Sequence, residues 1–549
     1  MKTPTNPFRL FLRALSLSGV FLLLARVDTA YAGSATWNLD PTSNDWNTAT
    51  NWTPNTVPNG PNDVATFATS SQREVGITSA IEVDSIVFEQ GASSFTLVKG
   101  PGELEDYLLT VSGAGIVNNS GAMQNFVLTN HSGAYTAIKF YNYASAGILA
   151  SYHLQATNAA GYNVPCYIEF YGSSSAGSAS FVNDGGGNTS DGGAATSFAE
   201  NATAASATIT LNGATHSDAA GGHSVFSDYS TADHATLTAN ATIGANGGGG
   251  TIYFLGAATA ANATLIAYGT TTAKSAQAAG ADQRAGHIFF GDVSDGGTAL
   301  VELFGNSFLD ISGRTKPGMS IGSIEGDGIV YLGRKQLSVG TNNLSTRFSG
   351  VLRDRGSAGG TGGQLEKVGT GTLTLNGTSL YTGGTTVSEG FLRVDNLAGS
   401  ATGPGTVQVN AGTLGGAGIM AGPVTVGSGT GPGAFIAPGS GASTLTTQSQ
   451  LTFKSDGTYV WRVRTTNAKA DKLVANGVTI ESGAQITGVG RGTLTTGTVL
   501  TAISNTSANS LSGTFANLPD GGTLTIGSNT LQANYEGGDG NDLTLTVVP

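Results

Sequence analysis

Phenylalanine residues recur at a fixed spacing in the middle of this 549-residue chain, and that spacing constrains the fold more than any other feature. Nine residues after each comes an alanine, and two residues later another apolar side chain. A repeat of about 20–50 residues is typical of a solenoid, in which each unit covers the apolar face of its neighbour. Four of the phenylalanines lie 28 residues apart and a fifth follows after 36: Phe170, Phe198, Phe226, Phe254 and Phe290.

Each repeat alternates apolar and polar side chains twice, once around the phenylalanine and once around the alanine. This alternation predicts two β-strands per repeat, joined by a turn of small residues. Stacked at the usual spacing of about 4.8 Å, the rings would form a column inside a rod on the order of 100 Å long. We therefore predict an all-β fold, a single-stranded parallel β-helix.

The composition is unusual, because 83 residues are glycine and only 11% are charged. Such a composition also occurs in disordered low-complexity chains. The regular phase of the phenylalanines and alanines argues against disorder, since a disordered chain has no reason to keep large apolar residues in register.

The N-terminus has the three parts of a secretory signal peptide: basic residues at Lys2, Arg9 and Arg13, an apolar stretch over residues 15–25, and an A-x-A site ending at Ala32. Cleavage there removes four basic and one acidic residue, which changes the net charge from −12 to −15. An acidic exported chain is a poor candidate for binding nucleic acid. We find no later apolar stretch of membrane-spanning length and expect no transmembrane segment in the mature chain.

We divide the chain at changes of composition and spacing. Trp37, Trp46 and Trp52 lie near the start of the mature chain, where they fit either the cap of a solenoid or an aromatic platform for sugars. The predicted segments are a signal peptide (1–32), a Trp-rich cap (33–70), a β-helix (71–317) with 28-residue repeats over about 167–303, a second β-helix region (318–396), and C-terminal turns with a cap (397–549).

One segment resembles a known family. The sequence runs L-E-K-V-G-T-G-T-L-T-L-N-G over residues 365–377, Y-T-G-G-T-T-V over 381–387, and G-F-L-R-V over 390–394. It is similar to the autotransporter-associated β-strand repeat of bacterial passenger domains. The resemblance implies a right-handed parallel β-helix that is exported and displayed or released outside a Gram-negative-type cell. The family supplies no catalytic residues.

Autotransporters with this repeat end in a membrane β-barrel of a few hundred residues, and this chain ends at Pro549 without alternating strands of that kind. We therefore expect a protein that is secreted, attached to the cell surface by a partner, or kept in the periplasm.

Three groups of polar residues are candidate sites. Asp539 and Asp542 lie in a G-G-x-G-x-D motif typical of calcium-binding turns. One copy supplies only half a site, so we favour a tight turn before the last strand over a calcium site. Acidic residues also recur two positions after the repeat phenylalanines, either as turn residues or as neighbouring carboxylates for calcium or acid–base chemistry. They are Glu200, Asp228 and Asp292.

The third group lies in the extra residues before Phe290, where a solenoid tolerates insertions on its outer surface. Lys274, Asp282 and Arg284, with Gln277 and Gln283, concentrate polar side chains there. This segment is either a contact site or a tolerated surface loop.

We expect a non-catalytic exported scaffold that serves adhesion or another extracellular interaction, with no catalytic or cofactor-binding residues. Its partner would be an extracellular or cell-surface ligand, and a polysaccharide is a candidate. The alternatives are a β-helix enzyme acting on polysaccharides (a lyase or hydrolase) and a calcium-dependent carbohydrate-binding module.

Overall fold

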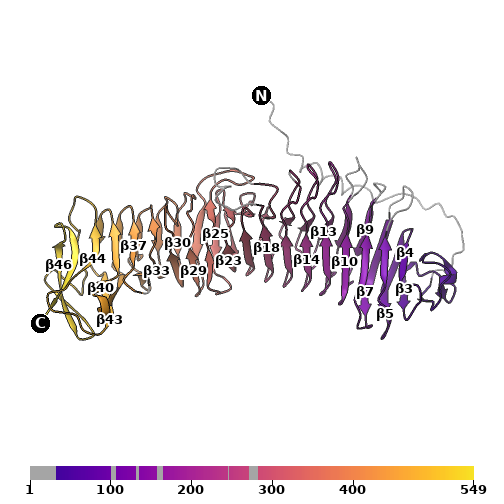
Figure 1. Ribbon diagram of the computed structural model, residues 1–549, viewed down its shortest axis with the longest axis horizontal. Helices are drawn as coiled ribbons and strands as arrows, with labels where there is room; N and C mark the ends of the chain where they lie inside the picture. The colour runs from indigo at the N-terminus through magenta and orange to yellow at the C-terminus, as the bar shows by residue number, and fades with distance from the viewer. Residues whose placement is uncertain are drawn as a thin grey trace, which may run out of the picture.

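The computed structural model describes residues 33–99, 107–130, 135–156, 165–244, 246–270, 282–439 and 441–549, and it is an elongated rod of stacked turns (Figure 1). The chain advances along the axis from its N-terminal to its C-terminal end. Most strands pair in parallel with the strands one turn before and one turn after. The only helices in the described ranges are 3-10 turns at Ala49–Asn51 and Thr465–Asn467. The predicted all-β parallel β-helix is confirmed.

The first sheet forms one face of the N-terminal two thirds of the rod. Its strands pair in parallel, except that β1 and β2 are antiparallel. In spatial order they are β2 (Trp52–Thr53), β1 (Ala35–Trp37), β3 (Gly60–Phe67), β5 (Ile81–Phe88), β7 (Tyr107–Asn118), β9 (Thr136–Phe140), β11 (Cys166–Phe170), β13 (Ala195–Phe198), β15 (His223–Phe226), β17 (Thr251–Phe254), β19 (His287–Phe290), β21 (Phe308–Asp310), β24 (Ile329–Tyr331) and β27 (Val351–Arg353).

The second sheet runs along most of the rod, and each of its strands follows a strand of the first sheet in the N-terminal turns. Its strands are β4 (Glu74–Ile77), β6 (Thr96–Lys99), β8 (Gln124–Leu128), β10 (Ala150–Leu154), β12 (Ser180–Asn183), β14 (Thr208–Leu211), β16 (Thr236–Ala239), β18 (Thr264–Tyr268), β20 (Leu300–Phe304), β23 (Ser323–Gly326), β26 (Thr346–Phe348), β29 (Thr372–Leu375), β31 (Phe391–Val394), β33 (Gly412–Gly416), β36 (Ala434–Pro438), β39 (Gly457–Arg464), β43 (Gln485–Arg491) and the short antiparallel β40 (Lys469–Ala470).

Two further sheets form the other faces of the C-terminal half. One is parallel throughout: β22 (Gly318–Ile321), β25 (Gln336–Val339), β28 (Gln364–Lys367), β30 (Thr385–Val387), β32 (Val407–Val409), β35 (Val424–Val426), β38 (Leu451–Phe453) and β42 (Val478–Ile480). The other ends in antiparallel strands: β34 (Ile419–Met420), β37 (Thr444–Thr447), β41 (Lys472–Ala475), β44 (Val499–Asn505), β47 (Asp542–Val548), β46 (Asn529–Gly537) and β45 (Thr523–Ile526).

The repeat phenylalanines form a column of stacked rings inside the rod, as their spacing predicts. All are fully buried. Successive ring centroids lie 4.6 to 4.9 Å apart, and the planes differ by 5 to 14°. Phe140 begins the column one turn before the predicted repeats, and it lies 30 residues before Phe170 rather than 28. The repeat alanines are buried too, and each lies directly before a strand of the second sheet.

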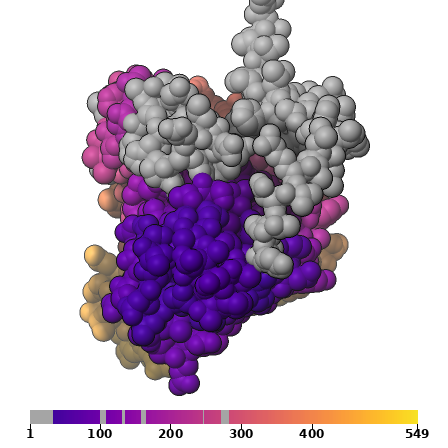
Figure 2. Space-filling model, turned by 90° about the vertical axis from the view of Figure 1, so that its right-hand side faces the viewer, coloured from indigo at the N-terminus to yellow at the C-terminus, as the bar shows by residue number. Residues whose placement is uncertain are grey.

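Both ends of the parallel stack are covered by other packing. At the N-terminal end Trp37, Trp46 and Trp52 are buried around Phe67, with centroid distances of 4.9 and 5.0 Å between indoles at steep angles. These rings have no exposed face to offer a sugar, and Figure 2 shows this end as a rounded, filled surface. At the C-terminal end the antiparallel strands β45, β46 and β47 end the parallel pairing.

Phe226→Asp should destabilise the middle turns by several kcal/mol, since it removes a buried ring and places a carboxylate without a partner between Phe198 and Phe254. Amide hydrogen exchange in β13, β15 and β17 should become faster, while exchange in the C-terminal sheets stays slow, because each turn contacts only its neighbours. Phe226→Leu is the matched control and should show a smaller effect. Unchanged exchange in the aspartate variant would contradict the column's role.

Candidate functional site

The acidic residues that follow the repeat phenylalanines are turn residues. Glu200, Asp228 and Asp292 have φ angles of 57°, 56° and 47°, in the left-handed region that glycine, asparagine and aspartate adopt most readily. Glycine occupies the same position in the neighbouring turns, with φ of 68° at Gly172 and 59° at Gly256.

Each of these carboxylates also binds the backbone of the preceding turn. The Gly172 N–H donates to Glu200 Oε2 (2.7 Å), and the Glu200 N–H donates to Asp228 Oδ2 (3.0 Å). The Gly256 N–H donates to Asp292 Oδ2 in the same way (3.0 Å). The carboxylates therefore join successive turns, which favours the turn interpretation over paired acid–base groups.

Asp539 and Asp542 lie at the hairpin turn between β46 and β47, not in stacked parallel turns. The Asp542 Oδ1 accepts a hydrogen bond from the Asn505 N–H (2.9 Å). Burial raises the pKa of the Asp542 carboxyl, and the charge of Asp539 raises it further. Across the described ranges, no group of three or more His, Cys, Asp or Glu side chains is placed to hold a metal ion.

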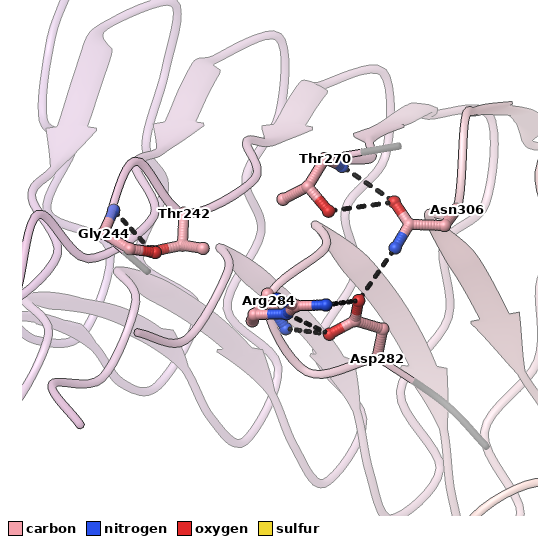
Figure 3. Close-up of polar contacts among 6 residues, drawn as sticks. All are labelled: Thr242, Gly244, Thr270, Asp282, Arg284 and Asn306. Carbon is pink, nitrogen blue, oxygen red and sulfur yellow. Dashed lines mark hydrogen bonds and ion pairs between the residues drawn. The ribbon is translucent and has the colours of Figure 1, made fainter. Parts of the chain in front are cut away.

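The insertion before Phe290 is described only at its base, and Lys274 and Gln277 lie outside the described residues. Asp282 forms an ion pair with Arg284 (2.8 Å) and accepts a hydrogen bond from Asn306 Nδ2 (3.0 Å), as Figure 3 shows. Asn306 Oδ1 in turn accepts from the Thr270 N–H (2.7 Å). Asn306 of the next turn therefore binds both described ends of the insertion, Thr270 and Asp282, and Arg284 pairs with Asp282.

The structure contains a polar ladder on the outside of the second sheet that the sequence analysis missed. His153 Nε2 lies 2.7 Å from Asp184 Oδ2, Asn212 Nδ2 donates to Asp184 Oδ1 (2.9 Å), and Asn240 Nδ2 donates to Asn212 Oδ1 (3.1 Å). A hollow of about 600 Å³ lies beside these residues, and we call it the side groove. Its lining includes Asp184, Asn212, Asn240, Thr215 and Ile243.

The missed signal lay in the 28-residue period itself. The fourteenth position after each repeat phenylalanine is polar in three turns and aromatic in the next two, so its chemical type changes while its place does not. The residues are Asp184, Asn212, Asn240, Tyr268 and Phe304.

The first pair of the ladder is titratable. The hydrogen bond that its ring donates to Asp184 raises the pKa of His153. Burial opposes the charged form of Asp184, but hydrogen bonds from His153 and Asn212 outweigh burial and lower the pKa of its carboxyl.

A lysine of the family-like segment has a structural role. Lys367 is buried, and its Nζ donates to the carbonyl oxygens of Val368 and Gly369 (2.6 Å each). Burial lowers its pKa to about 8. The lysine of the repeat motif therefore binds the turn that follows β28, and its position inside the rod makes it inaccessible to a ligand.

Asp228→Gly should lower the free energy of unfolding by at most about 1 kcal/mol, the value of the lost hydrogen bond, because glycine adopts the same φ. Asp228→Val should lower it by about 1–3 kcal/mol more, since a β-branched residue is strained at this φ. Denaturant unfolding of both variants measures the difference. Equal losses of stability in the two variants would show that backbone conformation does not restrict which residue this position accepts.

His153→Gln should lower stability at pH below 6.5, the ordinary histidine pKa. A raised pKa contributes stability that is present below the unfolded value and is lost as the pH rises through the folded value. The difference should be below about 1 kcal/mol, as for exposed ion pairs, and should vanish at alkaline pH. Thermal unfolding across pH measures it. His216→Gln is the control. Among the described residues, the His216 ring hydrogen-bonds only to the carbonyl oxygen of Ser217. A pH-independent loss would contradict the ion pair.

Comparison with known proteins supports the family resemblance at the segment that suggested it. A family model described as Passenger-associated-transport-repeat matches residues 365–394, from β28 to β31. No curated protein matches the chain. The crystal structure of the Haemophilus influenzae Hap adhesin is similar at 11% identity over 89% of this chain and 59% of that chain, with a TM-score of 0.26. This chain therefore spans less than two thirds of that structure. The present chain contains a passenger-associated transport repeat within a parallel β-helix.

Proposed function

We propose that this protein is an exported, non-catalytic β-helix scaffold that is displayed on, or released from, a bacterial surface and serves adhesion or another extracellular interaction. The passenger-associated transport repeat at residues 365–394 carries this proposal. The signal-like N-terminus gives independent support from the sequence.

The geometry also favours a binding role over catalysis. The recurring carboxylates, which a polysaccharide-degrading β-helix would need in a groove, hold backbone N–H groups of adjacent turns. These hydrogen bonds stabilise the rod. Because the carboxylates already accept hydrogen bonds from the backbone, they are unsuited to transfer protons to a substrate. In the part of the chain that the structure describes, no helix is long and apolar enough to cross a membrane.

Cell fractionation and a bead assay test the proposal together. The native protein should be found in the culture supernatant or with the outer membrane, and beads coated with the full chain should attach to cells or to extracellular polymer. Uncoated beads and beads coated with heat-unfolded protein are the controls.

A cytoplasmic location would contradict export. New reducing ends or unsaturated products from a polysaccharide panel would contradict the non-catalytic assignment and favour the enzyme alternative. Attachment that requires calcium and is lost in Asp542→Ala would favour the calcium-dependent binding module.

A further inference from the structure

A continuous column of five side chains runs along the outside of the second sheet, and we call it the amide–aromatic column. The first three members directly follow paired strand residues, and the last two, Tyr268 and Phe304, are themselves paired, so all five lie in register. Neighbouring strands lie about 4.8 Å apart, so the column extends over about 20 Å. It consists of Asp184, Asn212, Asn240, Tyr268 and Phe304.

The polar half of the column keeps unused hydrogen-bonding capacity. An asparagine side chain offers two donors and an acceptor oxygen with two lone pairs. The ladder uses one donor of Asn212 and one of Asn240. Within the described ranges the Asn240 Oδ1 has no hydrogen-bond partner, and both asparagines are half-buried along the side groove.

The other half of the column presents aromatic and apolar surface. Tyr268 and Phe304 stack with centroids 5.3 Å apart, yet their side chains remain 43% and 36% exposed. Ile243, at the edge of the side groove, is 85% exposed. The Thr242 N–H beside it donates to the Arg284 carbonyl oxygen (2.8 Å), so the base of the insertion borders this surface. Figure 3 shows Thr242 and Gly244, which flank Ile243 in the sequence, and Arg284 in the neighbouring turn.

We propose that the side groove and the adjoining amide–aromatic column bind an extended neutral polysaccharide that lies along the rod axis. This inference rests on the proposed function and names its ligand class. Amide groups hydrogen-bond sugar hydroxyls, and aromatic faces pack against the C–H faces of sugar rings. A groove of about 600 Å³ falls within the usual range for ligand sites.

The charge of the column favours a neutral ligand. Asp184 is its one ionisable member with a negative charge, and that carboxylate already accepts hydrogen bonds from His153 and Asn212. An anionic polymer would meet this carboxylate on a chain whose net charge is −15 once the predicted signal peptide is removed, and the column holds no basic cluster to compensate.

The sheet argues against a peptide ligand. An extended peptide usually binds by adding a strand to an exposed sheet edge. Along the column, β12, β14, β16 and β18 are each paired on both sides, so their backbone groups are already used. The column offers only side chains, which repeat at a regular interval as the units of a polysaccharide do.

Affinity electrophoresis of the full chain through gels containing neutral polysaccharides (a β-glucan, a galactomannan and a xylan), with alginate as the anionic arm, tests the inference. At least one neutral polymer should retard the protein. Asn240→Leu and Tyr268→Ala should each weaken that binding about five- to tenfold, the effect of losing one hydrogen bond or one ring contact. Tyr229→Ala, which removes a 72% exposed tyrosine between β15 and β16, should leave binding unchanged.

Circular dichroism of every variant checks that the fold is retained. Because Tyr268 is more exposed than a core residue, we expect Tyr268→Ala to disturb the fold less than Asn240→Leu. Absence of binding to any neutral polymer overturns the groove assignment, as does binding that the column variants do not weaken, or binding to alginate or peptides alone. If coated beads still attach in those cases, the proposed function stands without this site. If attachment is also lost, both fail.

Discussion

Parallel pairing between equivalent positions of successive turns is the interaction on which the rest of this structure depends. It places every residue directly above the residue one repeat earlier, so each inner position becomes a column of like side chains. A ring in the core can then be covered only by another group of similar size and shape. The phenylalanine column meets this requirement over six turns, with centroids never more than 4.9 Å apart.

The same constraint applies to the turns. A position that needs a positive φ needs it in every turn, and the chain satisfies it with glycine, asparagine, glutamate or aspartate. Where the residue is acidic, its carboxylate gains a second role, because the backbone N–H of the adjacent turn lies within reach. A period of acidic residues that suggests a catalytic pair in the sequence is therefore explained by the geometry of stacking.

The parts of this fold that sequence could predict are those in which the residue type itself repeats. Phe198 and Phe226 identified the inner column because phenylalanine recurs at one interval, while Phe140 was missed because its turn is two residues longer. The outer column that contains Asn240 and Tyr268 was not predicted, for a different reason. Outer positions face solvent, so stacking fixes their place but not their chemistry, and a change from amide to aromatic side chain hides the period.

This difference between inside and outside bears on where function can reside. Inner columns tolerate little variation, since a change in one turn leaves a cavity or a clash against two neighbours. Outer columns can vary turn by turn at small cost in stability, as the sequence of Asp184, Asn212, Asn240, Tyr268 and Phe304 shows. The rod therefore supplies a rigid spacing, and its outer positions supply chemistry at that spacing. A ligand that is itself a repeating polymer is the kind of partner that such a surface can contact at several turns at once, so that weak individual contacts combine into useful affinity.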